Sequence, residues 1–150
     1  HKTLEETLEL MRPVLRYSKM SIEKVFEAGL PAIGADSDQL QEAFLSLILN
    51  AMDAIGNKEG KLTIRTSSLK KGESIMVVFA DTGKGMSREE VGRIGELFFT
   101  TKEPQKGLGL GLITTYGIIN RHHGRIEVSS CEGKGTTFTI ILPLTQPEHV

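Results

Sequence analysis

The segment at residues 38–55 constrains the fold of this chain most strongly. Its apolar residues recur at helical spacing around nearly the whole circumference: Leu40, Ala43, Phe44, Leu45, Leu47, Ile48, Leu49, Ala51, Met52 and Ile55. At 100° per residue, its polar positions share one narrow stripe: Glu42, Ser46, Asn50 and Asp53. A helix that is apolar on nearly every side is buried, so we expect the stripe to face a partner, a ligand or water.

Six segments have the composition of β-strands. They cover residues 21–26, 32–35, 61–68, 75–80, 125–130 and 136–142. Residues 75–80 read Ile-Met-Val-Val-Phe-Ala, and such a continuous apolar run is typical of a central strand covered on both faces. The run ends at Asp81, so we expect a carboxylate at the edge of a buried sheet.

Two further long segments and one short one predict helices. Residues 4–17 have apolar side chains at helical spacing, with a kink or interruption expected at Pro13. Residues 110–122 form the second long segment. Residues 87–90 (Ser-x-x-Glu) are a capping box that begins a short helix, and residues 95–106 carry few regular signals and are expected to be a loop.

Composition narrows the classes of function. The 150 residues fit one domain, and eighteen basic against nineteen acidic residues give no support to binding nucleic acid or a membrane surface through bulk charge. The single cysteine, Cys131, excludes an internal disulfide and a cysteine-based zinc site, and it fits a reducing compartment. No apolar run approaches about 18 residues, so we expect a cytoplasmic domain without direct membrane contact.

Four segments carry the chemistry, and their order along the chain matters more than any one of them. They are the stripe around Asn50, residues 81–86 (Asp-Thr-Gly-Lys-Gly-Met), residues 107–111 (Gly-Leu-Gly-Leu-Gly) and residues 133–138 (Gly-Lys-Gly-Thr-Thr-Phe). Glycines before a helix let the backbone approach phosphate, which the free N–H groups and the helix dipole favour. A carboxylate at a strand end can accept a hydrogen bond from an amine such as that of adenine. An Asn oxygen is a hard ligand suited to Mg²⁺.

Each segment also has a simpler interpretation. Asn50 could be a hydrogen-bonded core amide, and Asp81 the start of a tight turn. Residues 107–111 could be a hinge, and residues 133–135 a hairpin turn. Familiar nucleotide loops are absent from the sequence, because it has no Gly-x-x-x-x-Gly-Lys-Ser/Thr motif, no Rossmann spacing and no His-Arg-Asp kinase loop.

In this order, the four segments resemble the ATP-binding catalytic domain of bacterial two-component sensor histidine kinases. The superfamily also contains DNA gyrase, the ATP-driven heat-shock chaperone and mismatch-repair ATPases. The resemblance covers residues 4–144 and implies a two-layer α/β sandwich of the Bergerat type, with a mixed, mostly antiparallel sheet of about five strands backed by three helices. Residues 97–102 (Leu-Phe-Phe-Thr-Thr-Lys) look like the lid of the nitrogen-regulation and sporulation-type branch.

The resemblance implies how adenine is held. Asp81, with Gly83 and Gly85, matches the first glycine box, whose aspartate binds the adenine amine. Thr136 matches the third glycine box, in which a hydroxyl helps to hold adenine, often through water.

The metal and the phosphates have their own matched residues. Asn50 stands where the asparagine box supplies the Mg²⁺ ligand, and Asp53 resembles the acid that contacts the metal through water in the ATPases of the superfamily. Thr101 and Lys102 belong to the lid, and we expect Lys102 near the terminal phosphate, where it acts catalytically together with Asn50. The second glycine box, which cradles the phosphates, comprises Gly107, Leu108, Gly109, Leu110 and Gly111.

Two features depart from the family pattern. Ser46 stands where many members carry a second Asn and where the hydrolysing relatives carry a Glu that activates water, which argues against an efficient ATPase. None of the four histidines is followed by an acid, as the family's phosphoacceptor is, and His122 and His123 are expected in a surface or capping role. We therefore expect residues 1–150 to be a single catalytic domain cut from a longer sensor kinase.

The implied function is binding of Mg²⁺–ATP and transfer of the γ-phosphoryl group to a histidine on the kinase's own dimerisation domain. The implied partners are that domain and a cognate response regulator, in a homodimeric full-length protein whose membrane anchoring is left open. Three alternatives remain: an ATP-hydrolysing switch of the same superfamily, a non-catalytic nucleotide-binding or docking module, and a serine-kinase regulator of the anti-sigma type.

Overall fold

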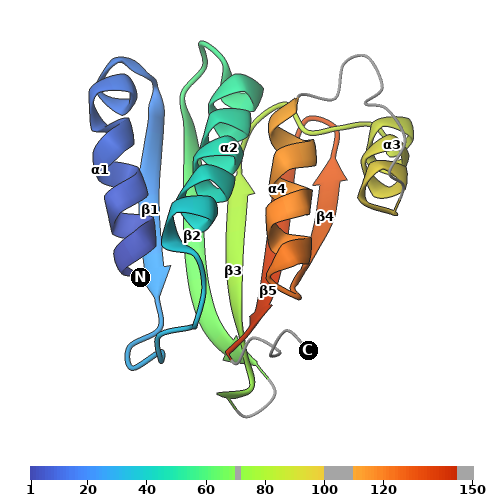
Figure 1. Ribbon diagram of the computed structural model, residues 1–150. Coiled ribbons are helices and arrows are strands. Elements are labelled where there is room, and N and C mark those ends of the chain that lie inside the picture. The colour runs from blue at the N-terminus through green and yellow to red at the C-terminus, as the bar shows by residue number, and fades with distance from the viewer. Residues whose placement is uncertain (70–71, 100–109, 145–150) are drawn as a thin grey trace.

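A five-stranded sheet and a layer of helices build the molecule (Figure 1). The computed structural model describes residues 1–69, 72–99 and 110–144, with the backbone alone for residues 95–99 and 110. The helices are α1 (Lys2–Tyr17), α2 (Ser37–Ile55), α3 (Arg88–Phe99) and α4 (Leu110–Arg121). The strands are β1 (Met20–Phe26), β2 (Gly60–Leu69), β3 (Ser74–Asp81), β4 (Arg125–Cys131) and β5 (Gly135–Pro143).

The sheet is mixed and mostly antiparallel, in the order β1-β2-β3-β5-β4. Only the β1–β2 pair is parallel among the described strands, and helix α2 forms the crossover between them. In the centre, Phe79 of β3 lies opposite Ile64 of β2 and Phe138 of β5. These three side chains are buried on the face that the helices cover. The predicted two-layer sandwich of about five strands is confirmed.

Helices α1, α2 and α4 lie over one face of the sheet, and α3 lies beside β4 (Figure 1). Helix α2 begins at Ser37, one residue before the predicted start, because Asp36 is its N-cap: the Asp36 carboxylate accepts hydrogen bonds from Asp38 N at 3.0 Å and Gln39 N at 3.2 Å. Its buried side chains are Leu40, Ala43, Phe44, Leu47, Ile48, Ala51 and Ile55. The side of α2 that carries Leu49 is not covered, because this side chain is 43% exposed. Helix α2 is therefore buried on fewer sides than its sequence predicts.

Three local predictions about the first half of the chain are wrong or incomplete. Residues 32–35 form no strand, because β1 pairs with β2 and the chain between β1 and α2 serves as the return connection. Pro13 does not interrupt α1. It lies on the exposed side of the helix, so the carbonyl group that its missing N–H leaves unpaired can bind water instead. Strand β3 is covered on one face only, since Met76 and Val78 on the opposite face are half-buried.

The second half brings one correction and one confirmed role. Residues 95–99, expected in a loop, belong to helix α3. Of the two roles expected for His122, surface or capping, the structure shows capping: the side chain is buried and bonds to two helices. Its Nδ1–H donates to Ile118 O at 2.8 Å, and its Nε2 accepts from Asp36 N at 3.1 Å, so the end of α4 is tied to the start of α2.

The helices are short or polar compared with what a bilayer demands. Within the described residues, none is both long and apolar enough to cross a membrane.

Candidate nucleotide site

A cavity of about 360 Å³ opens where β3 ends, between α2, α3 and α4. Its size falls within the range of small-molecule sites. Its wall combines a few polar groups with apolar side chains: Asn50, Asp53, Ala54, Asp81, Lys84, Gly85, Met86, Glu90, Ile94, Leu112, Thr136 and Phe138. Asn50, Asp53, Asp81, Gly85 and Thr136, predicted as site residues from distant parts of the sequence, thus meet at one place.

Asp81 is the last residue of β3, and the sheet register fixes its position. It lies opposite Leu62 of β2 and Thr136 of β5. Its Oδ1 accepts hydrogen bonds from Gly83 N at 2.8 Å and Thr136 N at 3.3 Å. Partial burial raises the pKa of this carboxyl above the ordinary value of 3.8, and the two backbone hydrogen bonds act in the opposite direction. The site therefore holds a partly desolvated carboxylate whose Oδ2 accepts no bond from the described residues.

The loop after Asp81 packs so closely on its neighbours that two positions require glycine. A Cβ at Gly83 would lie 2.6 Å from the Ala54 Cβ of helix α2. Gly85 has a φ of +68°, and a Cβ there would overlap the carbonyl of Cys131. Lys84 N donates to Ala54 O at 2.9 Å, which fastens the loop to the end of α2. Because these two positions are glycines, the loop can pack against the end of α2, which keeps Asp81 close to the helix that carries Asn50.

Asn50 projects from α2 into the same cavity. Its Nδ2 is the one buried side-chain nitrogen or oxygen without a hydrogen-bond partner in the described part of the chain. Such a group costs about 1–3 kcal/mol when it is left unpaired, so its presence calls for a ligand. Asp53 lies one turn further along on the same wall and is exposed, whereas Glu42, at the far end of the stripe, lies outside the cavity.

The first turn of α4 closes one side of the cavity, and its Leu112 lines the wall there. Gly111 packs near α2, and a Cβ added there would lie 3.3 Å from Ser46 Oγ. Leu110 and Gly111 therefore begin a helix whose N-terminus lies beside the cavity, an arrangement that favours anions. The other predicted phosphate-side residues, Thr101, Lys102, Gly107, Leu108 and Gly109, lie outside the described residues.

Comparison with protein families identifies the family to which the chain belongs. Residues 35–146 match the model of the histidine kinase-, DNA gyrase B- and HSP90-like ATPases. The chain belongs to this ATPase family. The matched range contains Asn50, Asp81 and Thr136, so the cavity wall is part of the family's own fold.

Relatives of this ATPase domain are sensor kinases. Sporulation kinase E of Bacillus subtilis (strain 168) is 33% identical over 143 residues, covering 95% of this chain and 19% of the relative. Sensor histidine kinase ZraS of Escherichia coli (strain K12) is 41% identical over 115 residues, covering 77% of this chain and 24% of the relative. The chain thus spans a fifth to a quarter of these two proteins, and it is the histidine-kinase type of ATPase domain.

A solved structure has the same fold. Full-length ShkA in complex with AMPPNP matches with a TM-score of 0.79 and 26% identity, covering 99% of this chain and 30% of ShkA. The agreement extends over nearly the whole ATPase domain, including the elements that form the cavity.

The apolar wall of the ATPase domain is the part that sequence reasoning missed. Met86, Ile94, Leu112 and Phe138 line the cavity together with Ala54. Their spacing is that of ordinary core residues, and Ile94 is only 1% exposed. A side chain on a cavity wall and one in the core follow the same periodicity, so the sequence alone carries no signal that separates them.

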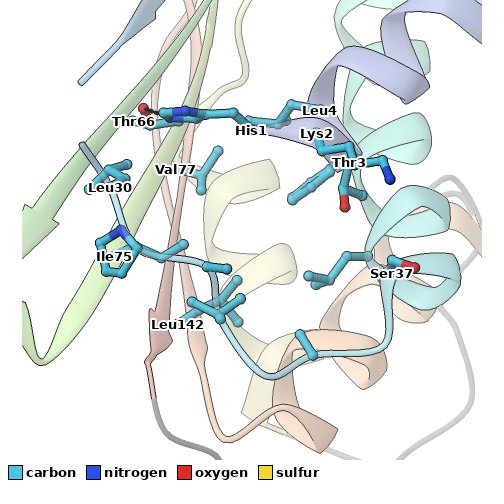
Figure 2. A pocket seen from close by; sticks show the side chains of 16 residues that line it. His1, Lys2, Thr3, Leu4, Leu30, Ser37, Thr66, Ile75, Val77 and Leu142 are labelled. Carbon is cyan, nitrogen blue, oxygen red and sulfur yellow. Dashed lines mark hydrogen bonds between the residues drawn. The ribbon is translucent and has the colours of Figure 1, made fainter. Parts of the chain in front are cut away.

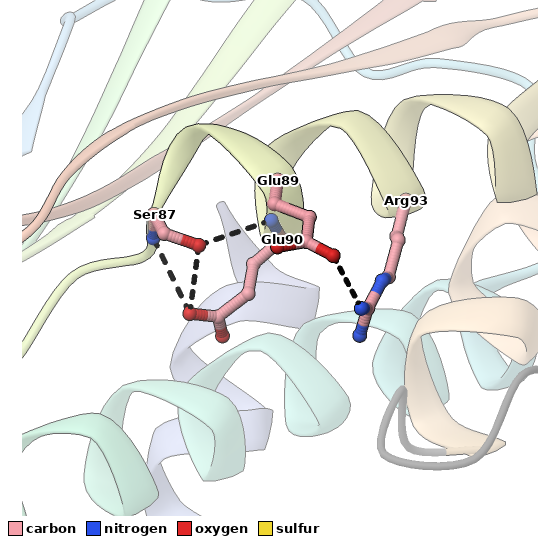
Figure 3. A network of polar contacts seen from close by, with 4 residues as sticks. All are labelled: Ser87, Glu89, Glu90 and Arg93. Carbon is pink, nitrogen blue, oxygen red and sulfur yellow. Dashed lines mark hydrogen bonds and ion pairs between the residues drawn. The ribbon is translucent and has the colours of Figure 1, made fainter.

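A polar network fixes the first turn of α3 beside this wall (Figure 3). Ser87 Oγ accepts from Glu90 N at 3.2 Å, and the Glu90 carboxylate accepts from Ser87 N at 3.3 Å. This is the predicted capping box. Arg93 adds an ion pair with Glu89 at 2.8 Å. The network orients α3 so that Glu90 and Ile94 reach the cavity.

A second cavity of about 350 Å³ lies near the opposite end of the sheet, by the start of α1 (Figure 2). Its wall is mainly apolar and includes Leu4, Phe44 and Val77. Its prominent polar groups already pair, because His1 Nε2 lies 2.8 Å from Thr66 Oγ1. It lacks the carboxylate and the unpaired amide that distinguish the first cavity, and we assign no chemistry to it.

Proposed function

We propose that this domain binds Mg²⁺–ATP and transfers the γ-phosphoryl group to a histidine of a separate dimerisation domain in two-component signalling. The observation that carries the proposal is the unpaired Asn50 amide in the same cavity as the Asp81 carboxylate. The unpaired Asn50 nitrogen can donate a hydrogen bond to a phosphate oxygen, and the oxygen of the same amide suits Mg²⁺. The Asp81 carboxylate suits the adenine base. ShkA, which shares this fold, is in complex with AMPPNP, an analogue of ATP, and this supports nucleotide binding by the protein.

In this proposal the adenine ring lies at the end of the cavity that holds Asp81. The free oxygen of the carboxylate accepts a hydrogen bond from the adenine amine, and the Thr136 hydroxyl adds a second polar contact, directly or through water. Met86, Ile94 and Phe138 offer an apolar surface to the ring. Burial of the flat purine against these side chains adds affinity that does not depend on the phosphates.

The phosphates lie toward α4, and Mg²⁺ lies at Asn50. A Mg²⁺ ion that binds together with a nucleotide keeps several waters and needs only one or two protein oxygens besides the phosphates. Asn50 would supply a hard oxygen ligand, and Asp53 would reach the metal through water. When bound, Mg²⁺ neutralises charge on the phosphates. Leu110 and Gly111 present the helix N-terminus to them, and Gly107, Leu108 and Gly109, with Thr101 and Lys102, complete the phosphate side by resemblance.

Transfer then requires an outside nucleophile. An imidazole nitrogen attacks the γ-phosphorus, a P–N bond forms, the bond to the oxygen bridging the β- and γ-phosphates breaks, and ADP leaves. The domain positions the nucleotide and neutralises charge. Both ring nitrogens of His122 are engaged within the fold. We therefore place the acceptor on the dimerisation domain of a longer, homodimeric cytoplasmic or membrane-anchored kinase, of which residues 1–150 form one catalytic domain and whose phosphoryl group passes to a response regulator.

One observation favours a second candidate, an ATP-hydrolysing switch. The exposed Asp53 carboxylate lies on the cavity wall, as an acid does in the hydrolysing relatives. Ser46, packed near Gly111, offers no carboxylate to take a proton from water.

Incubation with γ-labelled ATP separates the two candidates. The chain is tested alone and with a dimerisation hairpin that carries a His–acid pair from a related sensor kinase. We expect acid-labile label on the hairpin alone, with slow phosphate release by the isolated chain. Brisk release of phosphate without the hairpin would favour the hydrolysing switch.

A further inference from the structure

Ser130 of β4 lies behind the cavity wall and joins three segments of the chain through one hydroxyl group. Its Oγ accepts a hydrogen bond from Met86 N at 2.8 Å and donates to Gly135 O at 2.9 Å. The same atom lies 2.8 Å from Thr136 Oγ1. Ser130 is half-buried and does not line the cavity, whereas its neighbour Thr136 does.

The number of protons determines the direction of the Ser130–Thr136 hydrogen bond. A serine hydroxyl has one proton to donate and two lone pairs. Met86 N–H is a donor, so it occupies one lone pair. Gly135 O is an acceptor, so it takes the Ser130 proton. The remaining bond must then run from the Thr136 hydroxyl to Ser130, which uses the only proton that Thr136 Oγ1 carries.

Thr136 lines the cavity, and its Oγ1 consequently has only lone pairs left to offer a ligand there. The backbone donors nearby are also engaged, because Thr136 N and Gly83 N both donate to Asp81 Oδ1. The end of the cavity that holds Asp81 and Thr136 therefore presents hydrogen-bond acceptors. It matches a ligand that presents a donor at that position, such as a 6-amino purine, and repels a carbonyl oxygen there.

We propose that Ser130 is a positioning residue that fixes Thr136 as an acceptor and thereby makes the site prefer a 6-amino purine nucleotide over a 6-oxo purine nucleotide. This inference rests on the proposed binding of ATP. Ser130 touches no substrate, and it acts through the Thr136 hydroxyl. The same Oγ also holds the loop after Asp81, through its hydrogen bond from Met86 N. Removing the hydroxyl therefore loosens the loop as well. That effect weakens the binding of both nucleotides equally, so it cancels in the ratio of their Kd values.

The test is the ratio of the Kd values for Mg²⁺–ITP and Mg²⁺–ATP, measured by calorimetry on the full chain. In Ser130→Ala the Thr136 proton becomes free to donate to the 6-carbonyl of ITP. One hydrogen bond is worth about 0.5–1.5 kcal/mol, so we expect the preference for ATP to shrink about two- to thirteenfold. Ser129→Ala is the matched control, because Ser129 is exposed on the same strand, and it leaves the ratio unchanged.

Two further variants keep the result interpretable. Ser130→Thr keeps the hydroxyl and restores the wild-type ratio. If Ser130→Ala melts below the temperature of the assay, Ser130→Cys replaces it, since a thiol of similar size is a weak acceptor for the Thr136 proton and narrows the ratio as well.

The outcomes separate this inference from the proposed function. If a folded Ser130→Ala or Ser130→Cys variant binds both nucleotides more weakly by the same factor, or binds both as the wild type does, Ser130 does not set the preference and the inference is overturned. Wild-type protein that binds ATP and ITP equally overturns it too, while binding of ATP stands. If the wild type binds neither nucleotide, the proposed function fails together with it.

Discussion

Thr136 N donates to Asp81 Oδ1 at 3.3 Å across the β3–β5 ladder, so the residue opposite Asp81 in the sheet register also orients its carboxylate. The free oxygen of Asp81 is thereby directed by the sheet together with Gly83 N of the closely packed loop that follows. Substitutions at this carboxylate can therefore change ligand binding while the sheet that holds it stays in place.

Asp81→Asn is expected to weaken ATP binding without weakening the fold. The amide oxygen can still accept from Gly83 N and Thr136 N, but the NH₂ then meets the adenine amine as a second donor. Loss of a hydrogen bond to a charged group is worth about 1.5–3 kcal/mol, which corresponds to a rise in Kd of roughly ten- to a hundredfold. Calorimetry measures this change. Asp38→Asn, an exposed acid in the first turn of α2, is the control that should bind ATP normally.

The same variant has a second readout, its melting temperature. Because the folded-state pKa of Asp81 is raised, the stability linked to its protonated form is present at low pH and is lost as pH rises through the folded pKa. At neutral pH the carboxylate therefore destabilises the empty fold, and Asp81→Asn should melt at the same temperature as the wild type or higher. A clear drop in melting temperature would contradict the view that Asp81 serves binding at a cost to stability.

ATP affinity should also fall on acidification at a higher pH than an ordinary carboxyl would cause. Protonated Asp81 keeps a lone pair but loses its charge, so the bond from the adenine amine weakens. The pKa is raised above 3.8, which moves this loss upward in pH. A series of Kd values between about pH 7 and pH 4.5 tests the prediction, with Asp81→Asn as the baseline for protonation of the nucleotide itself. Parallel curves for the two proteins would rule it out.

Asn50→Ala should abolish the part of ATP binding that depends on Mg²⁺ and leave the fold intact. The substitution removes a buried, unpaired amide nitrogen, so the melting temperature should not fall. Affinities measured with Mg²⁺ and with a chelator give the metal-dependent part. Glu42→Ala, on the same stripe of α2 but outside the cavity, should keep it. An unchanged Mg²⁺ dependence in Asn50→Ala would return Asn50 to the role of a core amide.

Gly83→Ala should disturb the site through sterics alone. The new Cβ would meet the Ala54 side chain and backbone at 2.6–2.8 Å, so the loop after Asp81 must move away from α2. Overpacking of this kind costs about 1–3 kcal/mol, and ATP affinity should fall with it. The matched control is Gly92→Ala in α3, where a Cβ meets nothing within 4 Å and where alanine should stabilise the helix by about 0.5–1 kcal/mol. Equal melting temperatures and affinities for the two variants would be evidence against the close packing.

The sequence predicts those parts of the fold that local chemistry determines. Helix α2 begins at Ser37, one residue before the predicted start, because Asp36 caps it wherever the chain goes next. Residues 32–35 have strand composition, but no strand forms there, because the partner of β1 is chosen by a pairing about 40 residues away, Met20 with Gly60. Likewise, residues 75–80 reveal that β3 is apolar, but not that helices cover only one face of it.

The candidate site divides in a similar way. Asn50 is a polar residue among apolar neighbours and Asp81 directly follows an apolar run, and that contrast makes them recognisable in the sequence itself. Thr136, between Gly135 and Thr137, lacks this contrast and is indicated only by the family resemblance. Ile94 and Leu112 carry no contrast, because apolar residues at helical spacing describe a core and a cavity wall equally well. Their role depends on how α3 and α4 are placed around the end of β3, which is a property of the tertiary structure.

The bond between His122 and Asp36 has a mechanical consequence. It joins the end of α4 to the start of α2, and these two ends are the ones farthest from Asn50 and Gly111. The bond therefore restrains the spacing of the two helices at this end. We expect any change in their spacing to be largest at the opposite end, beside Asn50 and Gly111.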